Sequence, residues 1–207
     1  MPILFRDIEC RSTLLLSRVG AWRYAADPTT EVLCISHATD DAPVKIWTPD
    51  QPIPEEFFTA ARDPNWQIVA HNDQFETAIE ERILNPRFGW PLIPISRHRC
   101  TMAAALANAL PGALDAVAAA LEIRLRKDAE GYRVMRQMSR PRKPRKGENP
   151  AGIYWHDDPE RRAKLTDVFE IAGQHRLDGA VGALCLLQIL RLEPAAGRAS
   201  GAGTMKA

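Results

Sequence analysis

Alternating apolar and polar residues divide the first half of the chain into short strands and helices. Four segments are apolar and short enough to be strands, and we expect these strands at residues 3–9, 31–38, 44–47 and 66–70. The turn-forming residues 40–43 separate the second strand from the third and predict a hairpin. Helices are expected at residues 54–62 and 73–84, and Asn85-Pro86 should stop the second helix.

The middle of the chain has a helical pattern. Three helices are expected, at residues 101–110, 114–123 and 128–138, with Pro111-Gly112 ending the first. The expected order is three strands, followed by a helix, a strand and further helices. This order indicates one α/β domain. We place its bounds at residues 1–190 and expect a disordered, low-complexity tail at residues 191–207.

Residues 139–149 are rich in Pro, Lys and Arg, which predicts an exposed loop without regular structure. Two interpretations of this loop stay open. It is either a solvated linker or a basic arm that contacts DNA phosphates, where each neutralised phosphate would make binding more sensitive to salt. The candidate contacts are Arg142, Lys143, Arg145 and Lys146.

The amino-acid composition limits the classes of protein to which the chain could belong, but it does not identify one class. A chain of 207 residues, 45% of them hydrophobic, is long enough for a domain with a substantial core. Its formal net charge is +1, so overall charge does not argue for nucleic-acid binding. Such binding would have to come from local basic patches or from metal ions that bridge to phosphate.

Cysteine usage and targeting signals point to the cytoplasm. Cys10, Cys34, Cys100 and Cys185 are widely spaced, which favours buried thiols in a reducing compartment over a zinc site. The first residues lack the apolar core of a signal peptide, and the apolar run at 181–190 is about half a membrane span. We therefore expect a soluble cytoplasmic protein without a membrane partner.

Three acids are the candidates for chemistry. Asp7 and Glu9 are two residues apart on the first strand, so their side chains point to the same face. Carboxylates this close repel each other unless a cation lies between them, and oxygen ligands suit Mg²⁺ or Mn²⁺. Glu76 follows the strand at 66–70 and adds a third acid, whereas Asp73 is expected to be an exposed charge at the helix start. Acids alternating on an exposed strand face are the alternative interpretation.

The segments Asp7-Ile8-Glu9 and 71–76 together resemble the 3′–5′ exonuclease domains of the DEDD nucleases. The likeness is to the exonuclease domains at the N-terminus of bacterial and phage family A DNA polymerases, and it covers residues 1–165. The first family motif is Asp-x-Glu at the end of the first strand. The second is an Asn followed by an acid, matched by Asn72 and Glu76, with Glu in place of the usual Asp. The resemblance implies an α/β fold of the RNase H-like type, a mixed sheet flanked by helices.

The resemblance also implies a mechanism and its partners. In the family, four carboxylates hold two divalent ions, Mg²⁺ or Mn²⁺, and Asp7, Glu9 and Glu76 match three of these ligands. The substrate would be the 3′ end of single-stranded DNA, with Ile8, Asn72 and Phe75 beside it. A separately encoded polymerase subunit would be a natural partner.

The third family motif is not matched, and we expect the polymerase domain of the family to be missing. The family expects Tyr-x-x-x-Asp, or His with an Asp five residues later. Here the nearest acid and proton acceptor are Asp178 and His175, only three residues apart. The sequence therefore predicts a metal-dependent 3′–5′ exonuclease that is weak or inactive. The alternative is a catalytically dead nucleic-acid-binding remnant of a truncated or frameshifted DNA polymerase.

Overall fold

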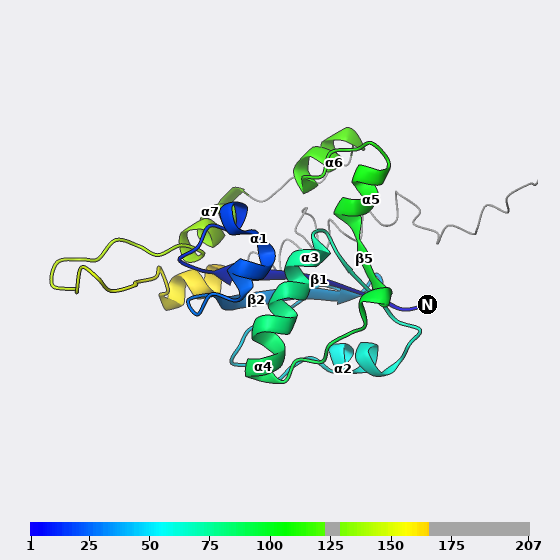
Figure 1. The fold of residues 1–207 in the computed structure, drawn as a ribbon, viewed down its shortest axis with the longest axis horizontal. Coiled ribbons are helices and arrows are strands. Elements are labelled where there is room, and N and C mark those ends of the chain that lie inside the picture. The colour runs from blue at the N-terminus through cyan, green and yellow to red at the C-terminus, as the bar shows by residue number, and fades with distance from the viewer. Residues whose placement is uncertain (123–128, 166–207) are drawn as a thin grey trace, which may run out of the picture.

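The computed structural model describes residues 1–122 and 129–165, and its centre is a five-stranded mixed sheet (Figure 1). The strand order is β3-β2-β1-β4-β5, with β1 in the middle. β2 and β3 run antiparallel to their neighbours, whereas β4 and β5 run parallel to β1. The strands are β1 (Ile3–Arg11), β2 (Glu31–Thr39), β3 (Lys45–Trp47), β4 (Gln67–Ala70) and β5 (His98–Cys100). This is the α/β architecture expected for an RNase H-like fold.

Helices cover the sheet and extend beyond it (Figure 1). α5 and α6 rise from the end of β5, and a further helical segment at residues 159–165 lies near α7. The helices are α1 (Leu16–Ala25), α2 (Glu55–Arg62), α3 (Asp73–Ile79), the π-helix η1 (Glu80–Leu84), α4 (Asn85–Phe88), the 3₁₀ helix η2 (Ile95–Arg97), α5 (Thr101–Ala107), α6 (Leu114–Ala120) and α7 (Ala129–Met138).

Both faces of the central strands are buried, which explains why these strands are nearly continuous apolar runs. On one face Leu4, Ile8 and Ile68 join the main core, whose aromatic centre includes Phe57 and Trp90 with ring centroids 4.4 Å apart. On the other face a smaller cluster joins strand β2 to α7 and the segment at 159–165. Its buried members are Cys34, Val134, Met138 and Leu165.

β5 and α1 are among the elements that the sequence pattern missed. β5 is only three residues long and lies in the polar run 97–99, so its parallel pairing with β4 rests on backbone hydrogen bonds rather than on an apolar signal. α1 lacks an amphipathic stripe and is interrupted at Gly20, whose φ of 74° is non-helical. Neither segment carries the periodicity by which strands and helices are recognised.

The prediction that Asn85-Pro86 stops the second helix was wrong. The helix passes through the π turn η1, in which the Asn85 N–H donates to the Glu80 carbonyl oxygen, and continues as α4. Pro86 lies in the first turn of α4, where a missing N–H costs little. The helix ends instead at Gly89, whose φ of 75° is the left-handed conformation that favours glycine.

The pairing of β1 with β2 contains one irregularity. Glu9 lies opposite Cys34, but the next residue, Cys10, lies opposite Val32, so Leu33 has no opposite residue. This is the geometry of a β-bulge, which bends a strand and increases its twist. Bulges are common beside functional sites, and this one immediately follows the two acids of β1.

The cysteines that the structure describes are free thiols. Cys10 and Cys34 are buried free thiols, as expected, and Cys100 is a half-buried free thiol. Within the two described ranges, no helix is long and apolar enough to cross a bilayer. Cys185, the apolar run at 181–190 and the tail at 191–207 lie outside the described residues.

Candidate active site

The sheet brings the start of α3 beside the end of β1. Phe5 of β1 lies opposite Val69 of β4, and β4 ends one residue later, so α3 begins level with the part of β1 that follows Phe5. That part carries Asp7 and Glu9, whereas the first turn of α3 carries Glu76. Parallel pairing of two strands therefore unites acids that are about 70 residues apart in sequence.

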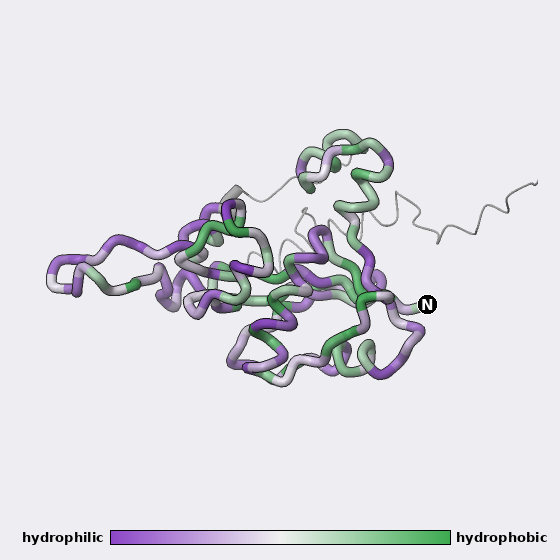
Figure 2. Tube along the Cα trace, in the orientation of Figure 1, coloured by the Kyte–Doolittle hydropathy of each residue, from purple (hydrophilic) through white to green (hydrophobic). Residues whose placement is uncertain are grey.

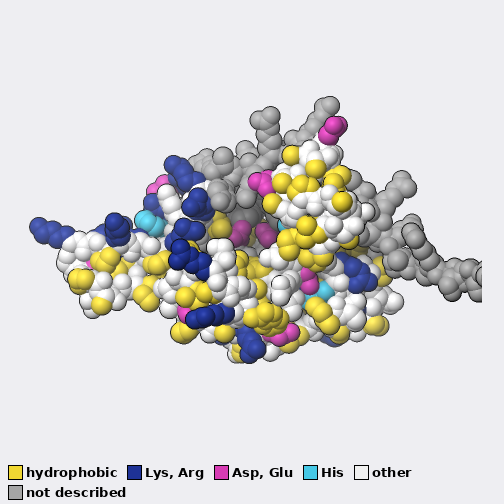
Figure 3. Space-filling model, turned by 45° about the horizontal axis from the view of Figure 1, so that its top comes forward, with side chains coloured by type: hydrophobic (Ala, Val, Ile, Leu, Met, Phe, Trp, Pro, Cys, Tyr) yellow, Lys and Arg dark blue, Asp and Glu magenta, His cyan; other side chains and the backbone are white. Residues whose placement is uncertain are grey.

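Asp7, Glu9 and Glu76 line one cavity of about 330 Å³, which we call the acidic cavity. A hollow with acidic side chains is visible between a group of Lys and Arg side chains and the helices α5 and α6 (Figure 3). Of the residues expected at the substrate, Ile8, Asn72 and Phe75 also line the acidic cavity, whereas the four expected phosphate contacts of the basic loop do not. Its remaining wall is largely apolar and includes Leu14, Leu15, Leu16, Tyr24 and Met135, with Ser139 and Arg140 at its polar side.

Glu76 is the most unusual acid of the cavity. It is only 3% exposed, and its Oε2 atom has no hydrogen-bond partner among the described residues. Burial raises the pKa of this carboxyl well above its ordinary value, the negative charge of Asp7 adds to the rise, and the charge of Arg6 opposes it. A buried, unpartnered carboxylate oxygen facing other acids fits a divalent cation, which would displace the proton and satisfy the oxygen.

The metal-ligand set itself is not preformed. Among residues 1–122 and 129–165, no three His, Cys, Asp or Glu side chains are arranged as a group that could hold a metal ion. The acids thus share a cavity without a ready ligand geometry. His175 and Asp178, the expected proton acceptor and fourth acid, lie outside the described residues.

Asp73 is buried, so the expectation of an exposed charge at the helix start was wrong. Its carboxylate lies 3.1 Å from Arg6 Nη2 and 3.1 Å from His98 Nδ1. Burial works to raise the pKa of Asp73, but the hydrogen bond from His98 and the charge of Arg6 outweigh it and hold the pKa below its ordinary value. Sequence reasoning missed this pairing, although an Arg inside an otherwise apolar strand start was a signal for it.

The second motif also makes contacts within the protein. The ring of His71 lies between Thr101 Oγ1 at 3.0 Å and the Gly112 carbonyl oxygen at 2.9 Å, and burial lowers the pKa of His71. Asn72 occupies the N-cap position of α3 as expected, but its side chain makes no capping hydrogen bond. Phe75 is half-buried, with its ring centroid 6.0 Å from that of Tyr24.

The basic loop leaves the body of the molecule after α7 and is strongly hydrophilic (Figures 1 and 2). Arg142 is used within the loop: two of its nitrogens each lie 2.7 Å from the Glu148 carboxylate, and its guanidinium stacks over Tyr154. The hydrogen bond from Arg142 lowers the pKa of Glu148 to about 2. The other predicted phosphate contacts, Lys143, Arg145 and Lys146, are exposed.

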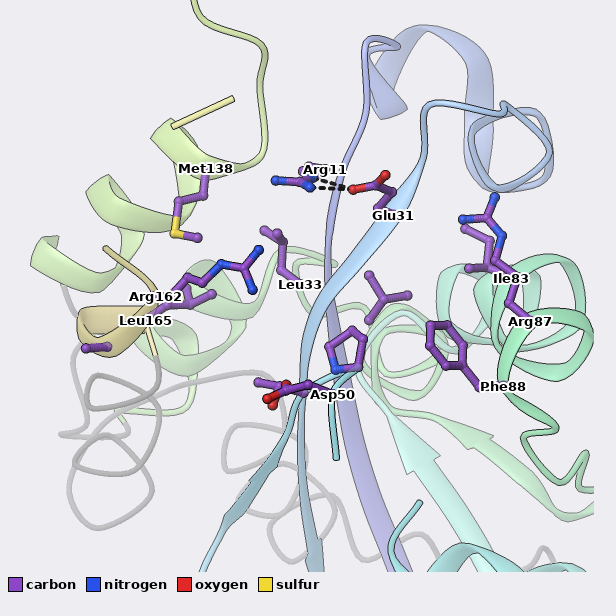
Figure 4. A pocket seen from close by; sticks show the side chains of 14 residues that line it. Arg11, Glu31, Leu33, Asp50, Ile83, Arg87, Phe88, Met138, Arg162 and Leu165 are labelled. Carbon is purple, nitrogen blue, oxygen red and sulfur yellow. Dashed lines mark hydrogen bonds and ion pairs between the residues drawn. The ribbon is translucent and has the colours of Figure 1, made fainter. Parts of the chain in front are cut away.

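A larger cavity, of about 620 Å³, lies elsewhere and contains none of the predicted site residues (Figure 4). Its charged side chains are engaged with protein groups: Arg11 donates to Glu31 at 2.7 Å, and Arg87 donates to the Thr30 carbonyl oxygen at 3.2 Å. Arg162, opposite them, is paired with Asp157. The smaller acidic cavity is the better candidate site, because it gathers three carboxyl groups, one of them the buried Glu76, whose Oε2 atom has no hydrogen-bond partner among the described residues.

Most of this chain is similar to part of a phage DNA polymerase. No family model matches the chain. The chain is 34% identical over 169 residues to the DNA polymerase of Bacillus phage SP02, and the match covers 80% of the chain. It spans only about a quarter of the length of that polymerase, 25%. The chain is thus a distant homologue of one part of a phage DNA polymerase.

Proposed function

We propose that this chain forms a metal-dependent 3′–5′ exonuclease domain of the proofreading type that acts on DNA. The observation that carries the proposal is the acidic cavity, where Asp7, Glu9 and the buried Glu76 meet in a homologue of a phage DNA polymerase. The exonuclease reaction and its substrate are our proposals.

The residues of the cavity suit hydrolysis of a terminal phosphodiester. Bound Mg²⁺ or Mn²⁺ would supply the activation of water and the stabilisation of the leaving 3′ oxygen. Asp7, Glu9 and Glu76 would hold the ions, with Glu76 giving up its proton on binding. Asn72 and Phe75 line the cavity beside these acids and would contact the last nucleotide.

Protein groups outside the cavity would bind the DNA strand and accept a proton from the attacking water. Lys143, Arg145 and Lys146 are exposed and would bind phosphates of the incoming DNA. We assign proton acceptance to His175 and the fourth carboxylate to Asp178, as the sequence resemblance suggests. Their spacing departs from the family pattern, so we expect slow hydrolysis.

Glu76 also departs from the family, which has Asp here. The extra methylene moves the ligand oxygens farther from α3, and octahedral Mg²⁺ tolerates such a change poorly. We therefore expect Mn²⁺ to support activity better than Mg²⁺.

The test uses single-stranded DNA labelled at its 5′ end, so that 3′–5′ digestion gives a ladder of shortening products. We expect digestion with Mn²⁺, none with a chelator, and none for Asp7→Ala. The matched control is Asp41→Ala, which removes an exposed acid in the β2–β3 turn and should not change the rate. Loss of activity in Asp178→Ala would assign the fourth ligand.

The exposed basic side chains of the loop favour one second candidate, a nucleic-acid-binding remnant without catalysis. Binding of the same DNA, measured by fluorescence anisotropy, without any Mn²⁺-dependent shortening would support the remnant and reject the exonuclease.

A further inference from the structure

A buried ionic cluster lies directly behind the acidic cavity. Arg6 is fully buried, and its guanidinium reaches two acids of the neighbouring helix. Arg6 Nε donates to Glu80 Oε1 at 2.6 Å, and Nη2 lies 3.1 Å from Asp73 Oδ1. His98 Nδ1 lies 3.1 Å from each carboxylate oxygen of Asp73, while its Nε2 lies 3.0 Å from the Ile93 carbonyl oxygen. We call Arg6, Asp73, Glu80 and His98 the Arg6 cluster.

The spacing of the helix acids connects this cluster to the cavity. Asp73, Glu76 and Glu80 are three and four residues apart, so they form one stripe along α3 and η1. The guanidinium of Arg6 bonds the first and last of these acids. The middle acid, Glu76, lies in the cavity with Asp7, which is the next residue after Arg6. Two adjacent residues of β1 therefore have different roles. Arg6 binds the helix formed by α3 and η1, and Asp7 lies in the same cavity as the helix residue Glu76.

Stability alone is a poor reason for such a cluster. Desolvation of buried ions offsets much of their attraction, and apolar replacements are often neutral or stabilising. A guanidinium has a planar fork of donors that fixes the position of each carboxylate it binds. Arg6 Nη2 also donates to Glu80 Oε2 at 3.1 Å, so three bonds link Arg6 to two points of the helix and restrict both its rotation and its sliding along β1.

We propose that Arg6 is a positioning residue that fixes α3 and η1 against β1 and so sets the place of Glu76 relative to Asp7. The inference rests on the proposed function, because its purpose is the spacing of two metal-binding acids. Metal ligands need supporting contacts of this kind, and loss of such a contact weakens metal affinity or activity by about 10–100-fold.

The test replaces the central ion pair with apolar residues of similar size, Arg6→Met with Glu80→Met, which leaves Asp73 paired with His98. The matched control is Arg11→Met with Glu31→Met. Arg11 lies on the same strand and also bonds two carboxylates, at 2.7 Å each, but it lies outside the acidic cavity.

We expect the Kd for Mn²⁺, measured by calorimetry without DNA, to rise about tenfold or more in the Arg6 double variant only. The kcat for DNA digestion should fall with it, while KM for DNA stays close to the wild-type value because the DNA-binding loop is untouched. Arg6→Lys should restore part of the affinity, since it keeps the charge but lacks the fork. A variant with only lowered thermal stability would not show this pattern.

A crystal structure of the Arg6 double variant tests the positioning without metal or DNA. A displacement of the Glu76 carboxyl from Asp7 by about 1 Å supports the inference, since such shifts are large for catalysis. An unmoved Glu76 with unchanged Mn²⁺ affinity overturns it. Failure of the proposed function looks different, because then the wild-type chain itself would not cut DNA. If the double variant does not fold, Glu80→Gln keeps the shape, removes the charge and is judged by the same two measurements.

Discussion

Replacing Glu76 with Gln should stabilise the metal-free protein at neutral pH. The folded state buries this carboxyl beside Asp7, and its pKa lies well above the ordinary value, first because of burial. The unfolded chain releases the proton near pH 4.3, whereas the folded chain keeps it to higher pH. The folded state therefore binds the extra proton over this interval, and the free energy of unfolding falls as the pH rises through it.

The size of this pH dependence follows from the single proton that Glu76 binds in the folded state. Where the folded state keeps the proton and the unfolded state does not, the free energy of unfolding falls by about 1.4 kcal/mol per pH unit. For a chain of this size the melting temperature should fall by roughly 3–6 °C per pH unit. Gln has nearly the same shape and no charge to lose, so Glu76→Gln should lack this component of the pH dependence.

The assay is thermal unfolding followed by circular dichroism from pH 4.5 upward, in the presence of a chelator. Glu81→Gln is the matched control, because Glu81 lies on the same helix and is exposed. Subtracting the wild-type curve from each variant removes the contributions of other titrating groups. Equal slopes for wild type and Glu76→Gln would refute the reasoning, and so would a Gln variant that is less stable at pH 8.

Three further predictions concern the ions, the loop and a buried histidine. Mn²⁺ at about 100 times its Kd should raise the melting temperature by roughly 5–10 °C, and Asp7→Asn should abolish most of the rise; equal rises would count against the site. Changing Lys143, Arg145 and Lys146 to Ser should lower the salt slope of DNA binding by about 2, measured by anisotropy; an unchanged slope would make the loop a linker. Burial lowers the pKa of His37 to about 4, so stability should fall by roughly 3 kcal/mol between pH 6.5 and 4, and His37→Phe should remove this fall.

The fold was largely predictable because its core strands carry strong apolar runs. Residues 3–9 and 66–70 could be recognised as strands because both faces of the sheet are covered. The secondary-structure predictions were wrong at positions where tertiary contacts determine the structure. β5 is held by pairing with β4, and the helix beyond Asn85 is continued by a π turn, whose hydrogen bonds no local propensity encodes.

The candidate site was predictable in part. Asp7, Glu9 and Glu76 could be chosen as candidates because motif spacing is visible in the sequence, and the structure places all three on one cavity. The role of Arg6 was not found, since a charged residue in an apolar strand signals that it needs partners but does not identify them, and here they lie 67 and 74 residues away. The polarity of Asp73 suggested exposure, whereas ion pairing within the protein made its burial possible.

The bulge after Glu9 has a consequence for how this site can diverge. Deleting Leu33 would restore regular pairing between β1 and β2, and the pairs from Leu4 to Glu9 would stay in register. Loss of the extra residue at this position therefore leaves the two acids in place. Homologues should accumulate gaps between residues 31 and 34 and should keep the spacing from residue 34 to residue 39 constant.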